Sequence, residues 1–167
     1  MKYLFKSYIV ILALVVVSSC STVETCILPD FYNKTEVSGE KSIYPYSFRI
    51  YSLDVDEISK AELKEYPKCD FKKLYSRDYL VVKWVSFENL DKDSKYLLDH
   101  LNRLNEESEK DSSITELNKD ILKDKLNFLF SGFYTQINNS KVTDRSYDFF
   151  YILDENKKLL YEFAVDE

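Results

Sequence analysis

Strand-like segments grouped near the end of the chain constrain its fold most. Residues 147–153 and 159–165 are rich in aromatic and aliphatic side chains. The five polar residues 154–158 lie between them, so the two segments predict a β-hairpin. A further short strand is expected at 133–137. Strands that follow one another along the chain favour antiparallel pairing.

Two more strands and a short helix are expected earlier in the chain. Residues 46–51 alternate between apolar and polar side chains after Pro45, which is typical of a half-buried strand. Residues 79–87 are β-branched and aromatic on both faces, so we expect a central strand. Between them, Ser59 and Glu62 have the spacing of a capping box, and the short helix that they open should end before Pro67.

Two long helices are expected in the middle of the chain. The first covers residues 93–109 approximately, with its leucines on one side. The second is predicted to open with a capping box of Ser113 and Glu116 and to continue as apolar residues at helical spacing up to Leu129. Gly132 then stands where a C-terminal cap is expected.

These elements together predict an α+β fold for residues 43–167, taken as a single globular domain. The sheet should be mainly antiparallel with about five strands, and two or three helices should pack on one of its faces. The aromatic content of 16% supports a packed core rather than a disordered chain.

The first twenty residues have the order of an export signal. Lys2 and Lys6 supply positive charge, and residues 8–17 form a run of ten apolar side chains. A membrane-spanning helix needs about 20 apolar residues, so this run is too short for an ordinary anchor. Small residues follow it, and then Cys20.

The segment Val17-Ser18-Ser19-Cys20 resembles the lipobox of bacterial lipoproteins, with valine where leucine is commonest. The resemblance covers only the leader. It implies cleavage after Ser19, a thioether-linked diacylglycerol on Cys20 and, often, an acylated new amino group. Two or three acyl chains would anchor the protein stably at the membrane, because each buried methylene contributes about 0.8 kcal/mol. Ordinary secretion with an incidental cysteine is the alternative.

The same resemblance places the mature protein in the cell envelope. Residues 1–19 are the expected signal peptide, and the polar residues 20–42, which show no sustained period, are the expected lipidated tether. In enteric bacteria, aspartate after the acylated cysteine favours retention in the inner membrane. This chain has Ser21 there, which favours the outer membrane, facing the periplasm or the cell surface.

Cys26 and Cys69 are the cysteines that remain once Cys20 is acylated. Export would deliver them to a compartment in which disulfides persist, so we expect a bridge between them. Closure of a loop of about 44 residues is worth about 4 kcal/mol in the chain-entropy model. Two unpaired thiols are the alternative. We expect no metal site, because no histidine or third thiol lies nearby in the sequence.

Charge and glycine content argue against several functions. Removal of residues 1–19 takes away two lysines and no acid, which leaves 21 basic and 29 acidic side chains and a net charge of −8. A chain of this charge has no general attraction for nucleic acids. With only Gly39 and Gly132, it also cannot form a phosphate-binding loop, a dinucleotide fingerprint or a nucleophile elbow. No cofactor is expected.

The polar residues give no catalytic motif, so no catalytic residue is expected. His100 should lie at the edge of the apolar side of the first long helix without a chemical role. Asp91 begins a segment like a calcium loop, but Tyr96 stands where glycine is required. The acids cluster, and are most simply solvated: Asp54, Asp56 and Glu57; Asp91 and Asp93; Glu106, Glu107, Glu109 and Asp111.

Tyrosine is the remaining unusual feature of the sequence. Six tyrosines lie in or near expected strands: Tyr44, Tyr46, Tyr51, Tyr147, Tyr151 and Tyr161. A place in the core or on a sheet face is sufficient to explain them. An exposed aromatic contact surface is the alternative.

Three functions are left open by these observations. The leading hypothesis is a non-enzymatic envelope lipoprotein whose domain contacts a protein partner. An acidic inhibitor or immunity lipoprotein that neutralises a basic toxin or enzyme is the second. The third is a hydrolase of an envelope polymer, because two carboxylates can converge from distant positions without a local motif.

Overall fold

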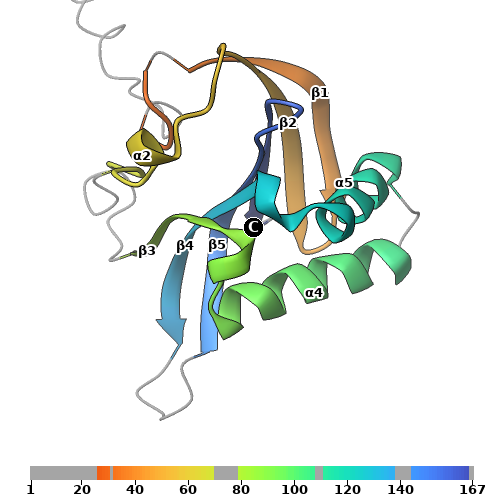
Figure 1. The fold of residues 1–167 in the computed structure, drawn as a ribbon. Helices are drawn as coiled ribbons and strands as arrows, with labels where there is room; N and C mark the ends of the chain where they lie inside the picture. The colour runs from red at the N-terminus through yellow and green to blue at the C-terminus, as the bar shows by residue number, and fades with distance from the viewer. Residues whose placement is uncertain (1–25, 31, 70–78, 108–110, 138–143, 166–167) are drawn as a thin grey trace, which may run out of the picture.

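A computed structural model describes residues 26–30, 32–69, 79–107, 111–137 and 144–165. They form a six-stranded antiparallel sheet with the strand order β1-β2-β6-β5-β4-β3, with the two long helices on one of its faces (Figure 1). The predicted α+β fold is therefore confirmed, with one strand more than expected. The strands are β1 (Asn33–Ile43), β2 (Tyr46–Asp54), β3 (Leu80–Ser86), β4 (Phe128–Ile137), β5 (Asp144–Asp154) and β6 (Leu159–Val165).

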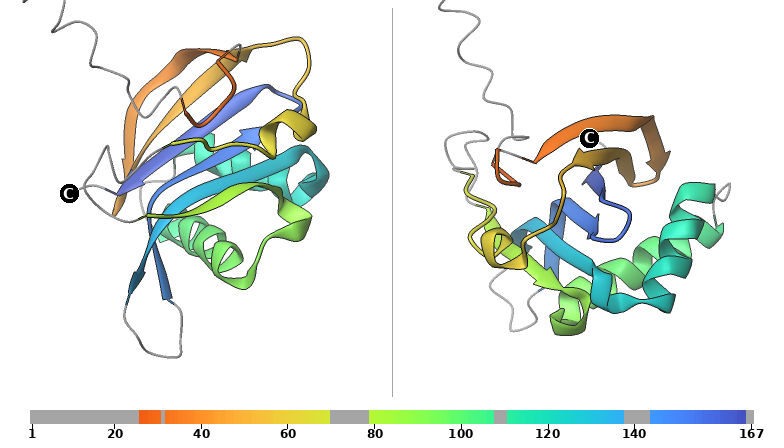
Figure 2. Two further views of the ribbon diagram at one scale, coloured as in Figure 1. Left: turned by 90° about the vertical axis from the view of Figure 1, so that its left-hand side faces the viewer. Right: turned by 45° about the horizontal axis from the view of Figure 1, so that its top comes forward.

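The helices lie on both sides of this sheet. The two long ones, α4 (Lys92–Glu107) and α5 (Ser112–Lys123), cover one face, and the short α2 (Lys60–Leu63) lies on the other (Figure 2). Single 3-10 turns, η2 (Phe87–Asn89) and η3 (Lys125–Asn127), lead into α4 and into β4. The predicted cap of the short helix is confirmed, since the Ser59 hydroxyl accepts a hydrogen bond from the Glu62 backbone N–H.

The tether expected over residues 20–42 extends too far, because β1 begins at Asn33 and pairs with β2. The register of this pairing shifts between Glu36 and Ser38 and again between Ser38 and Lys41. Each shift interrupts the alternation of inward and outward side chains, and most of the strand is exposed at the sheet edge. A strand of this kind has no regular apolar period, so its sequence has the pattern of a loop.

The strand predicted to be central, β3, is instead an edge strand that pairs only with β4 in the described sheet. Leu80 and Val81 are 46% and 39% exposed. Trp84 packs into the core on the α2 face, and Val82 and Val85 pack against the core on the other face, so the apolar composition reflects packing on both faces without a central position. The central positions belong to β6 and β5, which form the predicted hairpin.

The predicted second helix is wrong at both ends. Asp111 caps α5 in place of Ser113: its Oδ1 accepts hydrogen bonds from the backbone N–H groups of Ser113 at 2.8 Å and Ile114 at 3.3 Å. The helix ends at Lys123, and Gly132 lies within β4. A Cβ at Gly132 would stand 2.7 Å from a ring carbon of Tyr147, so this glycine serves a close approach between strands rather than a helix cap.

Aromatic side chains fill the core beneath the long helices. Phe150 stacks on Phe163 with ring centroids 4.4 Å apart, and Phe48 lies next to Phe163 at 5.5 Å. Five of the six tyrosines noted in the sequence are at most 7% exposed, which leaves Tyr44 as the exposed member at 82%. The exposed aromatic surface that these tyrosines could have formed is therefore not present.

Candidate functional site

The segment that follows the predicted anchor is fixed to the sheet face opposite α4 and α5. Ile27 and Leu28 are buried against that face. The Trp84 indole N–H donates to the Ile27 carbonyl oxygen at 2.9 Å, and the Lys68 backbone N–H donates to the Cys26 carbonyl oxygen at 2.8 Å.

A disulfide joins Cys26 to Cys69 on this side of the domain. The bridge and the two hydrogen bonds hold the start of the described chain at three points. The predicted cleavage and lipidation residues, Ser19 and Cys20, lie outside the described residues.

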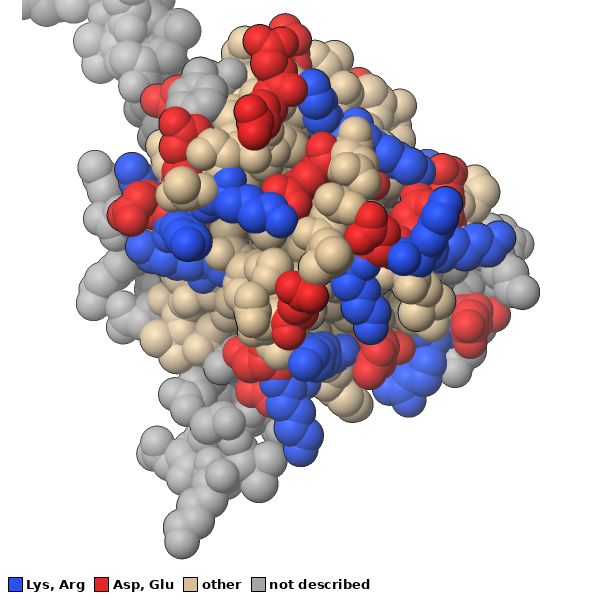
Figure 3. Space-filling model, viewed as in Figure 1, with Lys and Arg blue, Asp and Glu red and all other residues tan. Residues whose placement is uncertain are grey.

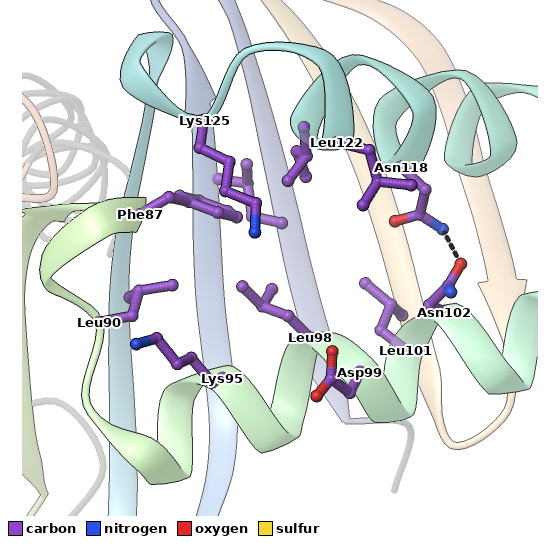
Figure 4. Close-up of a pocket in the computed structure, with 12 residues that line it drawn as sticks. Phe87, Leu90, Lys95, Leu98, Asp99, Leu101, Asn102, Asn118, Leu122 and Lys125 are labelled. Carbon is purple, nitrogen blue, oxygen red and sulfur yellow. Dashed lines mark hydrogen bonds between the residues drawn. The ribbon is translucent and has the colours of Figure 1, made fainter.

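A groove lies on the other side of the sheet, between α4 and α5, with a cavity volume of about 320 Å³ (Figure 4). This volume is within the range of about 300–1,000 Å³ that is typical of small-molecule sites. Its lining is mainly apolar and includes side chains of both helices, of η2 and of β5: Phe87, Leu90, Leu98, Leu101, Ile121, Leu122 and Ile152, with the polar residues Lys95, Asp99, Asn102, Asn118 and Lys125.

The groove follows from how the two helices use their apolar sides. Leu101 of α4 and Leu117 of α5 are 1% exposed and hold the helices against the sheet. Leu98 packs against the core cluster that contains Leu101 and Leu117 and is itself only partly buried. At one end the Asn118 side-chain amide donates to the Asn102 side-chain oxygen at 2.7 Å and joins the helices, as Figure 4 shows. The groove is therefore closed at that end and open along its length.

The opposite end of the groove carries two lysines. In Figure 4, Lys125 extends from η3 down into the space beside Phe87, and Lys95 extends from α4 toward Leu90. Neither ammonium group has a hydrogen bond or an ion pair with another described residue. Lys157, by contrast, contacts carboxylates of α5 at 2.6 and 2.7 Å. The two ammonium groups at the groove are thus available to a ligand.

Large apolar side chains are also exposed on and beside these helices. Leu122 is 76% exposed, Tyr96 is 65% exposed and Leu126 is 57% exposed. Leu122 lines the groove itself, Tyr96 precedes Leu97 on α4, and Leu126 follows α5 in η3. Of these three residues, Leu122 lines the groove, and an exposed apolar side chain at a concave surface is typical of a contact site.

Perturbed acids outside the groove have structural explanations. Burial raises the pKa of Asp154, although its carboxylate accepts hydrogen bonds from the backbone N–H groups of Lys157 and Asn156 in the β5–β6 turn. Burial also acts to raise the pKa of Asp111, but the Lys41 ammonium and the helix N–H groups outweigh it, and the pKa is lowered. Both carboxylates stabilise local structure.

The other residues singled out in the sequence do not come together as a site. His100 is half-buried and stacks on Tyr96 with ring centroids 6.4 Å apart. Asp91 Oδ1 accepts a hydrogen bond from the Ser94 backbone N–H at 2.8 Å, so this acid caps α4 instead of opening a calcium loop. Within the ranges that the structure describes, no group of three or more His, Cys, Asp or Glu residues could hold a metal ion.

The acids at 54–57 lie beside a second, more open hollow next to α2. Both of its lysines are engaged: Lys60 contacts Glu155 at 2.7 Å, and the Lys158 ammonium donates to the backbone oxygens of Val55 and Asp56. Figure 3 shows acidic and basic side chains interspersed over the face viewed in Figure 1. The negative net charge is therefore not gathered into one patch on that face.

Sequence reasoning predicted the two helices but missed the groove between them. Lys95, Leu98 and Lys125 form no motif, since they come from separate elements whose spacing only the fold defines. The apolar period of α4 was the single available signal, and it indicates a buried side without indicating a gap.

No helix among the described residues has the length and apolar character needed to cross a membrane. Comparison of the chain with protein-family models, with curated proteins and with solved structures finds no similar protein.

Proposed function

We propose that this chain is a small lipid-anchored protein of the bacterial envelope whose domain is a non-enzymatic protein-interaction module. The leader supports the anchor: cleavage after Ser19 would leave Cys20 to carry the acyl chains, with the outer membrane as the destination. A protein partner, rather than a nucleic acid or a cofactor, is the expected ligand of the domain.

The fixed start of the domain supports a defined orientation at the membrane. Cys20 and Cys26 are six residues apart, and an extended chain spans at most about 3.6 Å per residue, so their Cα atoms can be at most about 22 Å apart. Cys26 is held on the sheet face that carries α2. The face formed by α4 and α5 is on the opposite side of the sheet, where a partner can reach it (Figure 2).

The observation that carries the interaction role is the exposure of Leu122 in the groove, together with the exposure of Tyr96 on α4 and of Leu126 in η3. Exposed apolar side chains gain most when a partner removes them from water, at about 25 cal/mol for each Å² buried. An inhibitor of a basic enzyme would benefit from an acidic patch, and a hydrolase would benefit from two facing carboxylates of different pKa. No contact described above favours either of these alternatives.

Site-specific photocrosslinking in cells tests this proposal. A photoreactive amino acid at position 122 should give a discrete crosslinked protein species. Val37 provides the control, because it is an apolar residue of the sheet edge that is also largely exposed, at 57% against 76% for Leu122. Identical crosslinks at positions 122 and 37, or none at 122, would contradict the proposed interaction surface.

A further inference from the structure

The groove between α4 and α5 has the chemistry of a site for a small amphipathic anion. We propose that it binds a medium-chain alkyl carboxylate, with the hydrocarbon chain along Leu98 and Leu101 and the carboxylate at Lys95 and Lys125. This ligand is separate from the protein partner proposed above, and its binding does not require the lipid anchor.

The apolar part of the groove sets the kind of tail that fits. Its volume of about 320 Å³ is roughly twice that of a cavity of about 150 Å³ that admits benzene. From Lys95 to Asn102, α4 advances by seven residues, or about 10 Å at 1.5 Å per residue, which is the length of an extended chain of about eight carbons. The groove is longer than one apolar side chain, so a linear hydrocarbon chain fits it better than a compact ring such as benzene does.

The charges of the groove set the direction of the ligand. Lys95 and Lys125 stand at the end formed by Phe87 and Leu90, whereas the opposite end is closed by the bonded asparagines (Figure 4). Asp99 lies between the two ends, one turn after Lys95, and repels an anion placed at the middle of the groove. A carboxylate is therefore favoured at the lysine end, where two ammonium groups that have no ion pair with another described residue can donate to it.

Isothermal titration with sodium octanoate tests the proposal. Every described strand and helix lies between Cys26 and Val165, so a chain that begins at Ser21 keeps all of these elements, and without the acyl chains it needs no detergent. Octanoate should bind in a saturable way, and decanoate more tightly, by up to about fourfold for each added methylene that is buried. Octanol and octyltrimethylammonium, which share the chain but lack the negative charge, should bind more weakly than octanoate.

Variants of the lining separate this site from general adsorption. Lys95→Gln and Lys125→Gln should each weaken octanoate binding about threefold to fivefold, because each removes one exposed ammonium partner. Lys92→Gln on α4 and Lys119→Gln on α5 are the matched controls, since both lysines are exposed but do not line the groove. Asp99→Asn should tighten binding by removal of the repelling charge.

The location of the ligand has its own readout. Methyl NMR signals of Leu98, Leu101 and Ile121 should shift on titration with octanoate, and Leu98→Phe, which fills the groove with a larger side chain, should abolish binding. Octanol binding as tight as octanoate, or equal losses in the groove and control lysine variants, would overturn the proposal. An absence of octanoate binding combined with a specific crosslink at position 122 would also overturn it and would leave the protein partner as the occupant of the groove.

Discussion

Gly132→Ala tests the packing between β4 and β5, because the structure gives this glycine a different role from the one its sequence context indicates. A Cβ at this position would lie 2.7 and 2.8 Å from two ring carbons of Tyr147 and 3.2 Å from Cζ of Phe130. Tyr147 cannot easily move away: its ring is 3% exposed, packs edge-on against Phe130, and its hydroxyl lies 2.9 Å from Ser94 Oγ.

The expected loss follows from two opposing effects. Overpacking of a buried site costs about 1–3 kcal/mol. Alanine in a strand recovers about 0.5–1 kcal/mol relative to glycine. Since the new methyl group meets atoms of two buried rings, the upper end of the cost applies, and we expect the free energy of unfolding to fall by about 2 kcal/mol. Urea denaturation followed by circular dichroism measures this difference.

Gly39→Ala is the matched control for this substitution. Gly39 also lies in a strand, but a Cβ there would meet nothing within 4 Å, so this variant should keep or slightly increase stability. Replacement of Tyr147 by leucine should remove most of the cost of Gly132→Ala, with a coupling energy of about 1–2 kcal/mol. Equal effects of the two glycine substitutions, or no coupling to Tyr147, would refute the close approach.

Two further changes test contacts at the edges of the domain. Replacement of Cys26 and Cys69 by serine should lower the free energy of unfolding by about 4 kcal/mol, since the bridge closes a loop of about 44 residues. In urea denaturation, wild-type protein in a reductant should match the variant. A loss below about 1 kcal/mol would contradict this expectation. Asp111→Asn should destabilise the protein at neutral pH, because the lowered pKa of Asp111 means that its ionised form stabilises the folded state. That contribution is complete above the ordinary pKa of the carboxyl and is lost as the pH falls through the lowered pKa. The difference in unfolding free energy between Asp111→Asn and wild type should therefore shrink in acid. A difference independent of pH would contradict the contact with Lys41.

The sequence predicts the elements whose side chains face a core on one side. The alternation in β2, the polar turn between β5 and β6 and the apolar side of α4 are each local patterns with one structural solution. Position in the sheet is different in kind. Residues 79–87 have the composition of a central strand, yet β3 lies at an edge, because strand order is decided by which partners the whole chain brings together.

Caps and bulges were the other source of error. Ser113 and Glu116 have capping-box spacing, but Asp111, two residues before Ser113, accepts hydrogen bonds from two backbone N–H groups. Asp111 also contacts Lys41 at 3.0 Å. These two residues are 70 positions apart, so no local pattern contains their contact. Similarly, the register shifts of β1 hide a strand within a polar segment. The groove lysines, which come from α4 and η3, were out of reach of sequence reasoning for the same reason.

Metabolic labelling with palmitate tests most directly whether the protein is held at the membrane by lipid on Cys20. Wild-type protein should incorporate the label and migrate as the shorter, processed form, whereas Cys20→Ser should remain unlabelled and unprocessed. Equal labelling of the two proteins, or a wild-type protein that stays at precursor length, would show that lipid on Cys20 does not hold the protein at the membrane.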